Sequence, residues 1–554
     1  MKVPQQTLKD LQERLRHMER TRAPWWHTWR ELSDFFLPRR YPWLLTDKET
    51  RSAGIRNRNL LDSTSITALR TLATGMMNGI TSPARPWFRL RVAGFTEENT
   101  SHDVRVWLEE AATRMLTIMS ESNFYNALGI LYLEWCGMGT ASMSIYEDFD
   151  DVIRCHNHAV GEFYLDTDEN GRINRHARKF CRTVEQTVSM FGEENVSETV
   201  RADYRAGGVR RTNPVYIYHL IEPNDPPAPG TRRSAPYREY YWEAGKENDR
   251  VLRLGSLDEF PPIAVRWETY GSDVYGSSPC MDALPDVRQL MQMIKQRAKG
   301  LDKMVDPPML FNQALASKAK STLPGGHTYV RGQDLNAGGR PLYQINIPFQ
   351  ELNADIAACQ ARIRQVLFND LFRMISELET VRSATEIDAR REEKLVLLGP
   401  VLERFESEGL SPCIERIFNI CLRAGLFPPA PAELEQAEIK IQYVSIMADA
   451  QRAVGTVSIE RYLQLLGNMA SIFPESLDVP NPEEIIREYA ESIGVKTKLQ
   501  RSRAEVAEVR AARQEQEQIS QAAEQGQALI GGAQQLSQTD MGGGQNALSA
   551  LLGQ

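Results

Sequence analysis

The sequence of 554 residues lacks the short motifs that mark most enzymes. It contains no GxxxxGKS or GxxxxGKT phosphate-binding loop, because Gly245-Lys246 is followed by Glu247, and a motor ATPase would need such a loop. It has neither a GxSxG nucleophile elbow nor an HExxH zinc pair. We therefore predict no catalytic residue and no cofactor.

Paired cysteines and long apolar segments are also missing. The seven cysteines are scattered, odd in number and never spaced as CxxC, which argues against a disulfide framework or a structural zinc site and favours a reducing cytoplasm. No run of about 18 apolar residues occurs, so we expect no transmembrane helix. The opening residues, MKVPQQTLKD, lack the apolar core of a signal peptide.

An excess of basic residues is the last notable absence. The net charge is −8 and the isoelectric point is near 5.7. A protein that coats DNA by neutralising phosphates normally carries a basic excess, so that class is disfavoured, whereas a protein past which DNA slides is not. The length corresponds to roughly three or four domains. A content of 42% hydrophobic residues is enough for a substantial core.

Four adjacent residues, Cys155-His156-Asn157-His158, are the best metal candidates. On a strand only His156 and His158 would point to the same side, so at most two ligands would converge. Ordinary strand histidines are the interpretation we favour, and we predict no metal site.

Two acidic pairs are loosely similar to nuclease ligands, namely Asp150-Asp151 and Asp166 with Asp168. Both pairs fall in segments of turn composition, where solvated carboxylates are common. We favour turn carboxylates over a nuclease site.

The apolar spacing predicts helices on both sides of a β-rich segment. A long helix is expected over residues 5–37, kinked or split at Pro24, and two more helices over 103–138. Short strands and turns are expected over 140–275. The long helix carries Trp25, Trp26 and Trp29, which could stack on bases. Aromatic residues at helical spacing usually pack against a core, and we favour packing.

Two local signals lie inside the β-rich segment. Asp168–Gly171 should form a hairpin turn. Thr183 and Gln186 should form a capping box at the start of a short helix, which Gly192 can close.

The second half of the chain is predicted to be mostly helical. A helix with Pro285 in its first turn should end at Asp306-Pro307-Pro308, and a helix of about 28 residues should follow a Gly/Pro-punctuated segment. The expected elements are helices over 284–304, 350–376 and 385–408, a short strand over 439–443, a charged helix over 496–518, and a tail over 526–554 that is disordered or helical only when partnered.

Residues 62–92, DSTSITALRTLATGMMNGITSPARPWFRLRV, are the most distinctive stretch. Residues 62–64 supply N-cap chemistry, and apolar residues then recur every three or four positions, which predicts an amphipathic helix. Pro83 and Pro86 should end the helix, and the alternation from Trp87 predicts a strand. The helix also contains small residues that permit close packing: Ala68, Ala73, Gly75 and Gly79.

The wording of this stretch closely resembles the signature of the head-to-tail connecting (portal) proteins of short-tailed, double-stranded DNA bacteriophages. The resemblance extends over residues 5–515 or so. Further blocks that carry it are residues 275–285 (YGSSPCMDALP), 368–373 (FNDLFR), 383–387 (SATEI) and 398–400 (LGP), with Glu406 and Glu408 beyond them.

The resemblance implies an α+β, mainly helical subunit that assembles into a ring. The implied parts are a wing at 1–280 with its β-rich region at 140–275, a first stem helix at 281–304, a clip at 305–348, a second stem helix at 349–376, a tunnel loop at 377–384, a helix at 385–410 that links wing and crown, a crown at 411–495, and a helical barrel or disordered tail at 496–554.

The resemblance also implies a function without catalysis. The ring, usually of twelve subunits, would sit at one capsid vertex of the virion, after synthesis in the cytoplasm of the host bacterium. DNA would be pumped in through it and would leave by it at infection. The implied partners are other copies of the chain, the large terminase subunit, tail adaptor and tail tube proteins, the major capsid and scaffolding proteins, and double-stranded DNA that passes non-specifically, with no membrane.

Candidate site residues follow from this assignment. On the first stem helix four basic residues are spaced seven, four and four apart and so share one face. A solvated helix face without a channel role is the alternative. The DNA-channel candidates are Arg288, Lys295, Lys299, Lys303, Glu377, Arg382 and Ser383, and the candidates for terminase docking in the clip are Lys318, Lys320, His327 and Arg331.

Two other classes of protein compete with the DNA conduit. A nuclease or motor subunit would need a metal or nucleotide site, for which the sequence offers no motif. A helical oligomeric head/tail adaptor or scaffold without a DNA channel would share the mixed-charge helices and would differ by the absence of a central hole.

Overall fold

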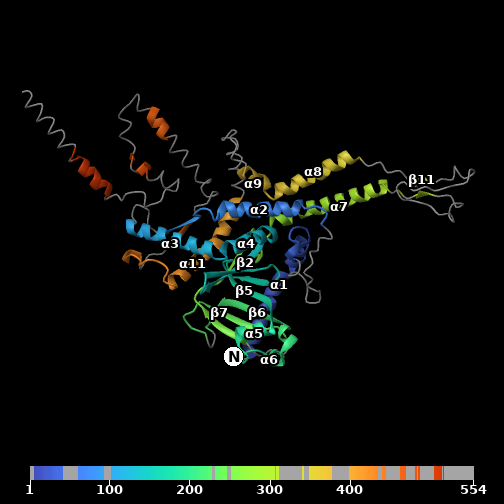
Figure 1. Ribbon diagram of the computed structural model, residues 1–554, viewed down its shortest axis with the longest axis horizontal. Helices are drawn as coiled ribbons and strands as arrows, with labels where there is room; N and C mark the ends of the chain where they lie inside the picture. Colours follow the sequence, from blue (N-terminus) through green and yellow to red (C-terminus); the bar gives the residue numbers. More distant parts are fainter. Residues whose placement is uncertain are drawn as a thin grey trace, which may run out of the picture. The chain divides into compact units, whose positions relative to one another are not determined.

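The computed structural model combines helices with antiparallel sheets, which confirms the predicted α+β class (Figure 1). Its chain forms two compact units: one comprises residues 1–90, 111–428 and 441–454, the other residues 91–110, 429–440 and 455–554. The structure describes residues 5–40, 60–92, 101–227, 231–245, 251–305, 307, 309–310, 340–341, 348–376, 398–434, 439–443, 462–468, 481–482, 484–486, 505–514 and 516.

Two antiparallel sheets make up the predicted β-rich region, which is confirmed. The larger sheet has the strand order β4-β5-β6-β7-β8, and the smaller one has the order β3-β2-β9. In Figure 1, β2 lies between β5 and the helix α4. The strands are β2 (Thr140–Asp148), β3 (Val152–His158), β4 (Phe163–Thr167), β5 (Ile173–Thr183), β6 (Pro214–Pro223), β7 (Tyr237–Glu243), β8 (Val251–Leu257) and β9 (Pro262–Arg266).

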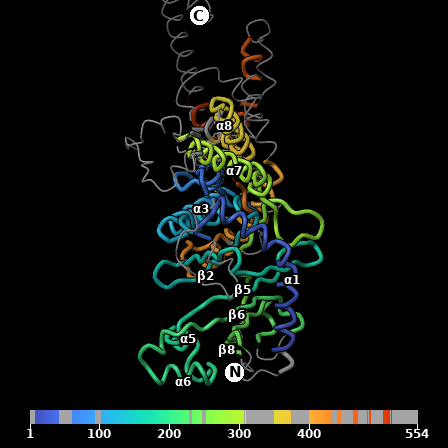
Figure 2. Tube along the Cα trace, turned by 90° about the vertical axis from the view of Figure 1, so that its right-hand side faces the viewer, coloured from blue at the N-terminus to red at the C-terminus, as the bar shows by residue number. Residues whose placement is uncertain are grey.

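Both local signals in this region are confirmed. The turn between β4 and β5 closes through a hydrogen bond from the Gly171 N–H to the Asp168 carbonyl, and Gly171 has φ +75°. The capping box of Thr183 and Gln186 starts α5 (Val184–Phe191), which Gly192 ends. Between α5 and β6 the chain adds α6 (Glu198–Ala206) and the 3-10 helix η3 (Gly208–Thr212), and Figure 2 shows α5 and α6 on the side of the large sheet opposite α1.

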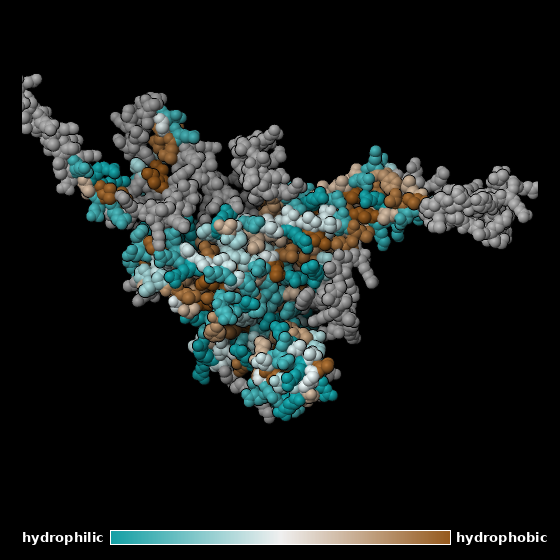
Figure 3. All heavy atoms as spheres, in the orientation of Figure 1, coloured by the Kyte–Doolittle hydropathy of each residue, from teal (hydrophilic) through white to brown (hydrophobic). Residues whose placement is uncertain are grey.

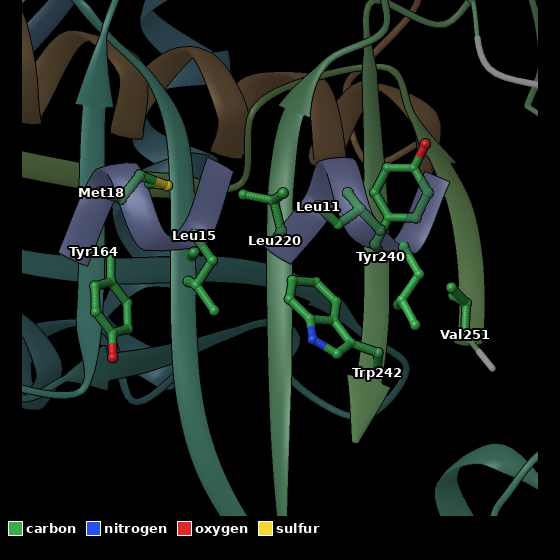
Figure 4. Packing of buried hydrophobic residues seen from close by; sticks show 10 residues of the cluster. Leu11, Leu15, Met18, Tyr164, Leu220, Tyr240, Trp242 and Val251 are labelled. Carbon is green, nitrogen blue, oxygen red and sulfur yellow. The ribbon is translucent and has the colours of Figure 1, made fainter. Parts of the chain in front are cut away.

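Helix α1 (Gln5–Phe35) crosses one face of the large sheet (Figure 4). Its apolar stripe packs on side chains from each of the five strands. Pro24 lies inside the helix, which is not split there; a kink stays a prediction. Packing on both sides of the proline holds the two halves together. The core here contains Leu8, Leu11, Leu15 and Met18 of α1 with Tyr164, Ala177, Leu220, Tyr240, Trp242 and Val251 of the sheet.

The distinctive stretch folds as predicted, into α2 (Thr64–Ile80) and β1 (Phe88–Val92). The Asp62 carboxylate accepts the N–H of Thr64 at 2.7 Å, which begins the helix. At Gly75 a Cβ atom would come within 2.2 Å of the Phe372 ring, so this glycine permits the close approach of α9. The two predicted helices over 103–138 are confirmed as α3 (His102–Glu121) and α4 (Phe124–Met138).

Helix α4 buries a carboxylate. Glu134 is almost fully inaccessible, and its Oε1 lies 2.8 Å from Nε of Arg40, which directly follows α1. Burial raises the pKa of Glu134 to about 7, against the opposing influence of the Arg40 charge, and the carboxylate of Glu162 raises it further.

The predicted helix at 284–304 exists but begins earlier, as α7 (Pro279–Val305). The Ser278 hydroxyl accepts the N–H of Met281 at 3.3 Å, so Ser278 caps the helix and Pro279 takes its first position. Pro285 therefore lies in the second turn and not in the first.

The predicted helix of about 28 residues is interrupted. It consists of α8 (Phe349–Val366) and α9 (Asn369–Ser376), because Phe368 adopts φ +54° between them. Both α8 and α9 pack on α2, and Phe372 of α9 fills the space left by Gly75.

Downstream, residues 398–423 form one helical segment with a π-turn. The described part of the predicted 385–408 helix is helical from residue 398, widens into the π-turn η6 (Glu406–Leu410) and continues as α11 (Ser411–Arg423). The predicted strand is confirmed as β12 (Ile439–Tyr443). Other short elements are β10 (Met309–Leu310), β11 (Arg340–Pro341), the 3-10 turn η7 (Ala432–Leu434), and helical residues 462–468 and 505–514. None of the helices in the ranges given above is both long and apolar enough to cross a bilayer.

Candidate functional site

Helices α7 and α8 form an antiparallel pair that carries the predicted channel residues (Figure 1). Arg297 donates a hydrogen bond to Oδ1 of Asn353 at 3.0 Å, and further along the pair Arg362 donates to the Asp286 carboxylate at 3.1 Å. The sulfur of Cys359 lies 3.3 Å from the Asp286 carbonyl oxygen. These contacts fix the face that α7 turns toward α8.

Three of the predicted channel residues lie in a row on α7. Lys295, Lys299 and Lys303 recur every four residues and are all exposed. Arg297, which bonds α8, projects from the other side of the helix, since it stands two residues from its lysine neighbours. The lysine row therefore faces away from the α7–α8 contact.

Arg288 shares the lysine face and is paired within the chain. Its guanidinium makes two hydrogen bonds to the carboxylate of Glu31 on α1, and these bonds raise the Arg288 pKa. A charge already paired in this way attracts a phosphate less strongly than an unpaired one. The structure thus gives Arg288 a role as a link between α7 and α1, and its channel role stays a prediction.

The other predicted site residues lie outside the described residues and stay predictions: Glu377, Arg382 and Ser383 of the expected tunnel loop, and Lys318, Lys320, His327 and Arg331 of the expected clip.

The end of α7 also exposes large apolar side chains. The exposed fractions of Leu301, Met304 and Val305 are 51%, 42% and 79%. Figure 3 shows apolar atoms concentrated on this helix pair. Grouped apolar residues of this kind on a surface indicate a contact with another molecule.

The residues proposed as metal candidates are used in packing. Cys155 is buried, and Asn157 donates its amide to the Ala127 carbonyl at 2.7 Å. His158 Nε2 lies 2.8 Å from the Ser144 hydroxyl. Across the part of the chain that the structure describes, no three His, Cys, Asp or Glu side chains are grouped so that they could hold a metal.

The acidic pairs serve local structure. Asp151 pairs with Arg154 on the surface at 3.2 Å, and the Asp168 carboxylate accepts two backbone N–H groups of its own turn. Asp166 lies in strand β4 and not in a turn, so its prediction is wrong; it pairs with Arg175 of the adjacent strand at 2.9 Å.

The tryptophans of α1 pack, as favoured above. Trp29 is fully buried and donates its indole N–H to the Met138 carbonyl at 3.0 Å. The ring of Trp25 stacks on it with a centroid distance of 6.2 Å. Trp29 is therefore inaccessible to a base.

Sequence reasoning missed three histidines that the fold brings together between the two sheets. His158 of β3, His176 of β5 and His219 of β6 are all buried. The rings of His158 and His176 lie 5.2 Å apart, and Nε of Arg178 lies 3.3 Å from Nδ1 of His219. Burial lowers the pKa of each, and that of His219 reaches about 4.

A buried arginine of β9 joins three segments. Nε of Arg266 lies 3.1 Å from each carboxylate oxygen of Glu408 in the π-turn. Its guanidinium also donates to the carbonyl oxygens of Gly171 at 2.8 Å and Asp273 at 3.3 Å. The π-turn is thus fixed to the smaller sheet and to the β4–β5 turn.

Comparison with known proteins assigns the chain to a family. Residues 8–500 match the family model described as bacteriophage head to tail connecting protein. The chain therefore belongs to the bacteriophage head-to-tail connecting proteins, as the resemblance implied.

Two curated relatives agree with this family. The probable portal protein of Bordetella phage BPP-1 is 37% identical over 505 residues, which are 91% of this chain and 90% of the relative. The portal protein of Salmonella phage epsilon15 is 36% identical over 539 residues, 96% of this chain and 95% of the relative. Among solved structures, a chain from the neck of an empty GTA particle matches with a TM-score of 0.35 and 12% identity, over 77% of this chain and 91% of that one.

Proposed function

We propose that this protein is the portal subunit of a bacteriophage, which forms a ring at one capsid vertex. The observation that carries the proposal is the identity of 36–37% to two phage portal proteins over at least 90% of both chains. The ring is the route by which DNA enters the capsid and leaves it. Its work is structural and needs no catalysis.

Each part of a portal subunit can be assigned to a range of this chain. The two sheets with α1 are the wing, α7 with α8 and α9 are the stem, and residues 305–348 and 377–384 are the clip and the tunnel loop. The crown is residues 411–495. The assignment is supported by the exposed apolar residues at the end of the α7–α8 pair. Neighbouring subunits in a ring would bury these residues.

The lysine row of α7 is proposed to face the channel. Residues four apart on a helix rise by about 6 Å, so the row presents a line of separated charges rather than a cluster. Because phosphate contacts dominate affinity for DNA, sparse lysines in an otherwise acidic chain attract the duplex without arresting it.

The partners follow from the position of the ring. In the virion the subunit contacts its own copies, the capsid and the tail. During assembly it contacts scaffolding protein and the terminase that drives packaging, for which the clip residues Lys318, Lys320, His327 and Arg331 are the proposed docking site.

Electron microscopy of the purified protein, with native mass measured on the same sample, tests the function. The expected result is a closed ring of about twelve 62.8 kDa subunits with a hole wide enough for B-DNA. A stable assembly without a hole would overturn the proposal in favour of an adaptor or scaffold.

A charge-removal variant tests the channel face. Lys295→Gln, Lys299→Gln and Lys303→Gln together should leave ring formation intact but flatten the salt dependence of binding to a short DNA duplex, because fewer counterions are released. Arg210→Gln, at an exposed basic residue of η3, is the matched control and should behave like the parent. An unchanged salt dependence in the triple variant would mean that these lysines do not face DNA in the channel.

A further inference from the structure

Polar side chains link the two sheets. Ser142 of β2 and His176 of β5 are 3.0 Å apart, from hydroxyl oxygen to Nε2, and join one sheet to the other. Arg178 of β5 lies 3.4 Å from Nδ1 of His158 on β3 and forms a second link. The opposite face of the large sheet packs on α1 with apolar side chains, and the rest of the histidine-bearing face packs on α5 and α6.

The layer continues along the large sheet. His219 stands between Arg178, whose Nε lies 3.3 Å from its Nδ1, and Glu239, whose carboxylate lies 3.2 Å from its Nε2. The His219 ring also stacks on Tyr241 with a centroid distance of 3.9 Å and an interplanar angle of 5°. Because arginine is always protonated and donates, these contacts place the imidazole proton on Nε2, facing Glu239.

The charged groups around the histidines include both carboxylates and arginines. Glu239 already faces His219 and lies 3.6 Å from Arg253. Arg178 faces both His158 and His219 as a fixed positive charge. The groups that face the cluster are Ser142, Ser144, Tyr146 and Asp148 of β2, Arg154 and His156 of β3, Phe163 of β4, Arg178 and Arg182 of β5, Glu239 and Tyr241 of β7, and Arg253 of β8.

We propose that this histidine cluster is an acid-sensitive joint: protonation of His158, His176 and His219 loosens the contact between the two sheets while the helical part of the same unit stays folded. Glu239, the carboxylate that faces His219, is already shared with Arg253, and a new positive charge in the layer would lie beside Arg178. It can be solvated only if water enters between the sheets. Below the ordinary pKa of histidine the open form therefore binds more protons and gains population.

Hydrogen exchange read by mass spectrometry on the full-length protein at pH 7.5 and pH 5.0, corrected for the intrinsic exchange rate, tests the joint. Peptides from β2, β3 and β5 should lose protection at pH 5.0, and peptides from α2 and α4 should not. With a pKa of about 4 when buried, His219 alone raises the opening equilibrium about 30-fold at pH 5.0. Equal protection at the two pH values would overturn the proposal.

Variants separate the cluster from other acid effects. His219→Gln keeps an acceptor for Arg178 and a donor for Glu239 but does not titrate, so the acid response should shrink by about 30-fold. His158→Gln, His176→Gln and His219→Gln together should abolish it, whereas His17→Gln, on the exposed face of α1, should leave it intact. A full response in His219→Gln would overturn the proposal even if the triple variant failed to fold.

Discussion

Replacement of Glu134 by glutamine should change how the stability of this protein depends on pH. The carboxyl group is buried in α4 beside Arg40, and its pKa of about 7 in the folded state lies well above the ordinary value of 4.5. The folded state therefore binds a proton more tightly than the unfolded state. Stability from this group is fully present below pH 4.5 and is lost as pH rises through 7.

The magnitude follows from the difference in pKa. A shift of 2.5 units at about 1.4 kcal/mol per unit corresponds to about 3.4 kcal/mol over the whole titration. Between pH 5 and pH 8 the linkage relation gives a loss of about 2.5 kcal/mol in the free energy of unfolding. Glu134→Gln removes the titration and should remove this part of the pH dependence. The exposed Glu169→Gln, in the β4–β5 turn, is the matched control and should retain it.

Urea unfolding followed by tryptophan fluorescence at pH 5, 6.5 and 8 provides the measurement, since Trp135 lies buried one residue away on the same helix. The free energy of unfolding of the parent minus that of Glu134→Gln should fall by about 2.5 kcal/mol from pH 5 to pH 8. A difference that stays constant within about 0.5 kcal/mol would refute the reasoning, because it would mean that Glu134 titrates alike in both states.

Two further pairs of substitutions follow from the geometry. Gly139→Ala and Gly171→Ala both force alanine into a left-handed conformation at a cost of about 1–2 kcal/mol. Only at Gly139 would the new Cβ meet backbone, 2.2 Å from the Gly276 carbonyl oxygen. Gly139→Ala should therefore cost about 1–3 kcal/mol more than Gly171→Ala and should have the lower melting temperature of the two. Arg266→Met should cost about 3 kcal/mol, because the Glu408 carboxylate would keep only the more distant Arg404 at 4.0 Å, and Glu408→Gln should cost less. Equal melting temperatures within either pair would contradict the corresponding argument.

Elements with local signals could be predicted from the sequence. The N-cap chemistry at Asp62, the capping box at Thr183 and the hairpin turn at Asp168–Gly171 each act within a few residues, and all three are present in the structure. The start of α7 also had a local signal, the pair Ser278-Pro279, which the emphasis on Pro285 obscured.

Features that depend on distant partners could not be predicted. The break at Phe368 places a bulky residue at positive φ, which its local sequence disfavours. The break is accompanied by the packing of Phe372 on Gly75, almost 300 positions away in the sequence. The pairing of Arg288 with Glu31 is equally remote in the sequence. The helical spacing of the lysines on α7 was visible beforehand, but the partner of Arg288 was not.

The histidine cluster could not be predicted from the sequence either, because it depends on how the strands pair. His176 and Arg178 alternate on β5, which places them on one face, but strand register alone decides that His219 stands beside Arg178. A shift of one residue in that register would move His219 to the α1 side of the sheet.

The π-turn at Glu406–Leu410 makes the position of α11 depend on the number of residues in this segment. A π-turn holds one residue more than the α-helical turn that it replaces, and each residue advances a helix by about 100°. With the extra residue, Phe405 packs on Trp135 and Ile417 also faces inward. An in-frame loss of one codon would let the helix close without a gap, yet it would rotate α11 by about a quarter turn and carry Arg416 away from the Ile145 carbonyl. A single-residue deletion here would therefore disturb contacts well beyond the turn itself.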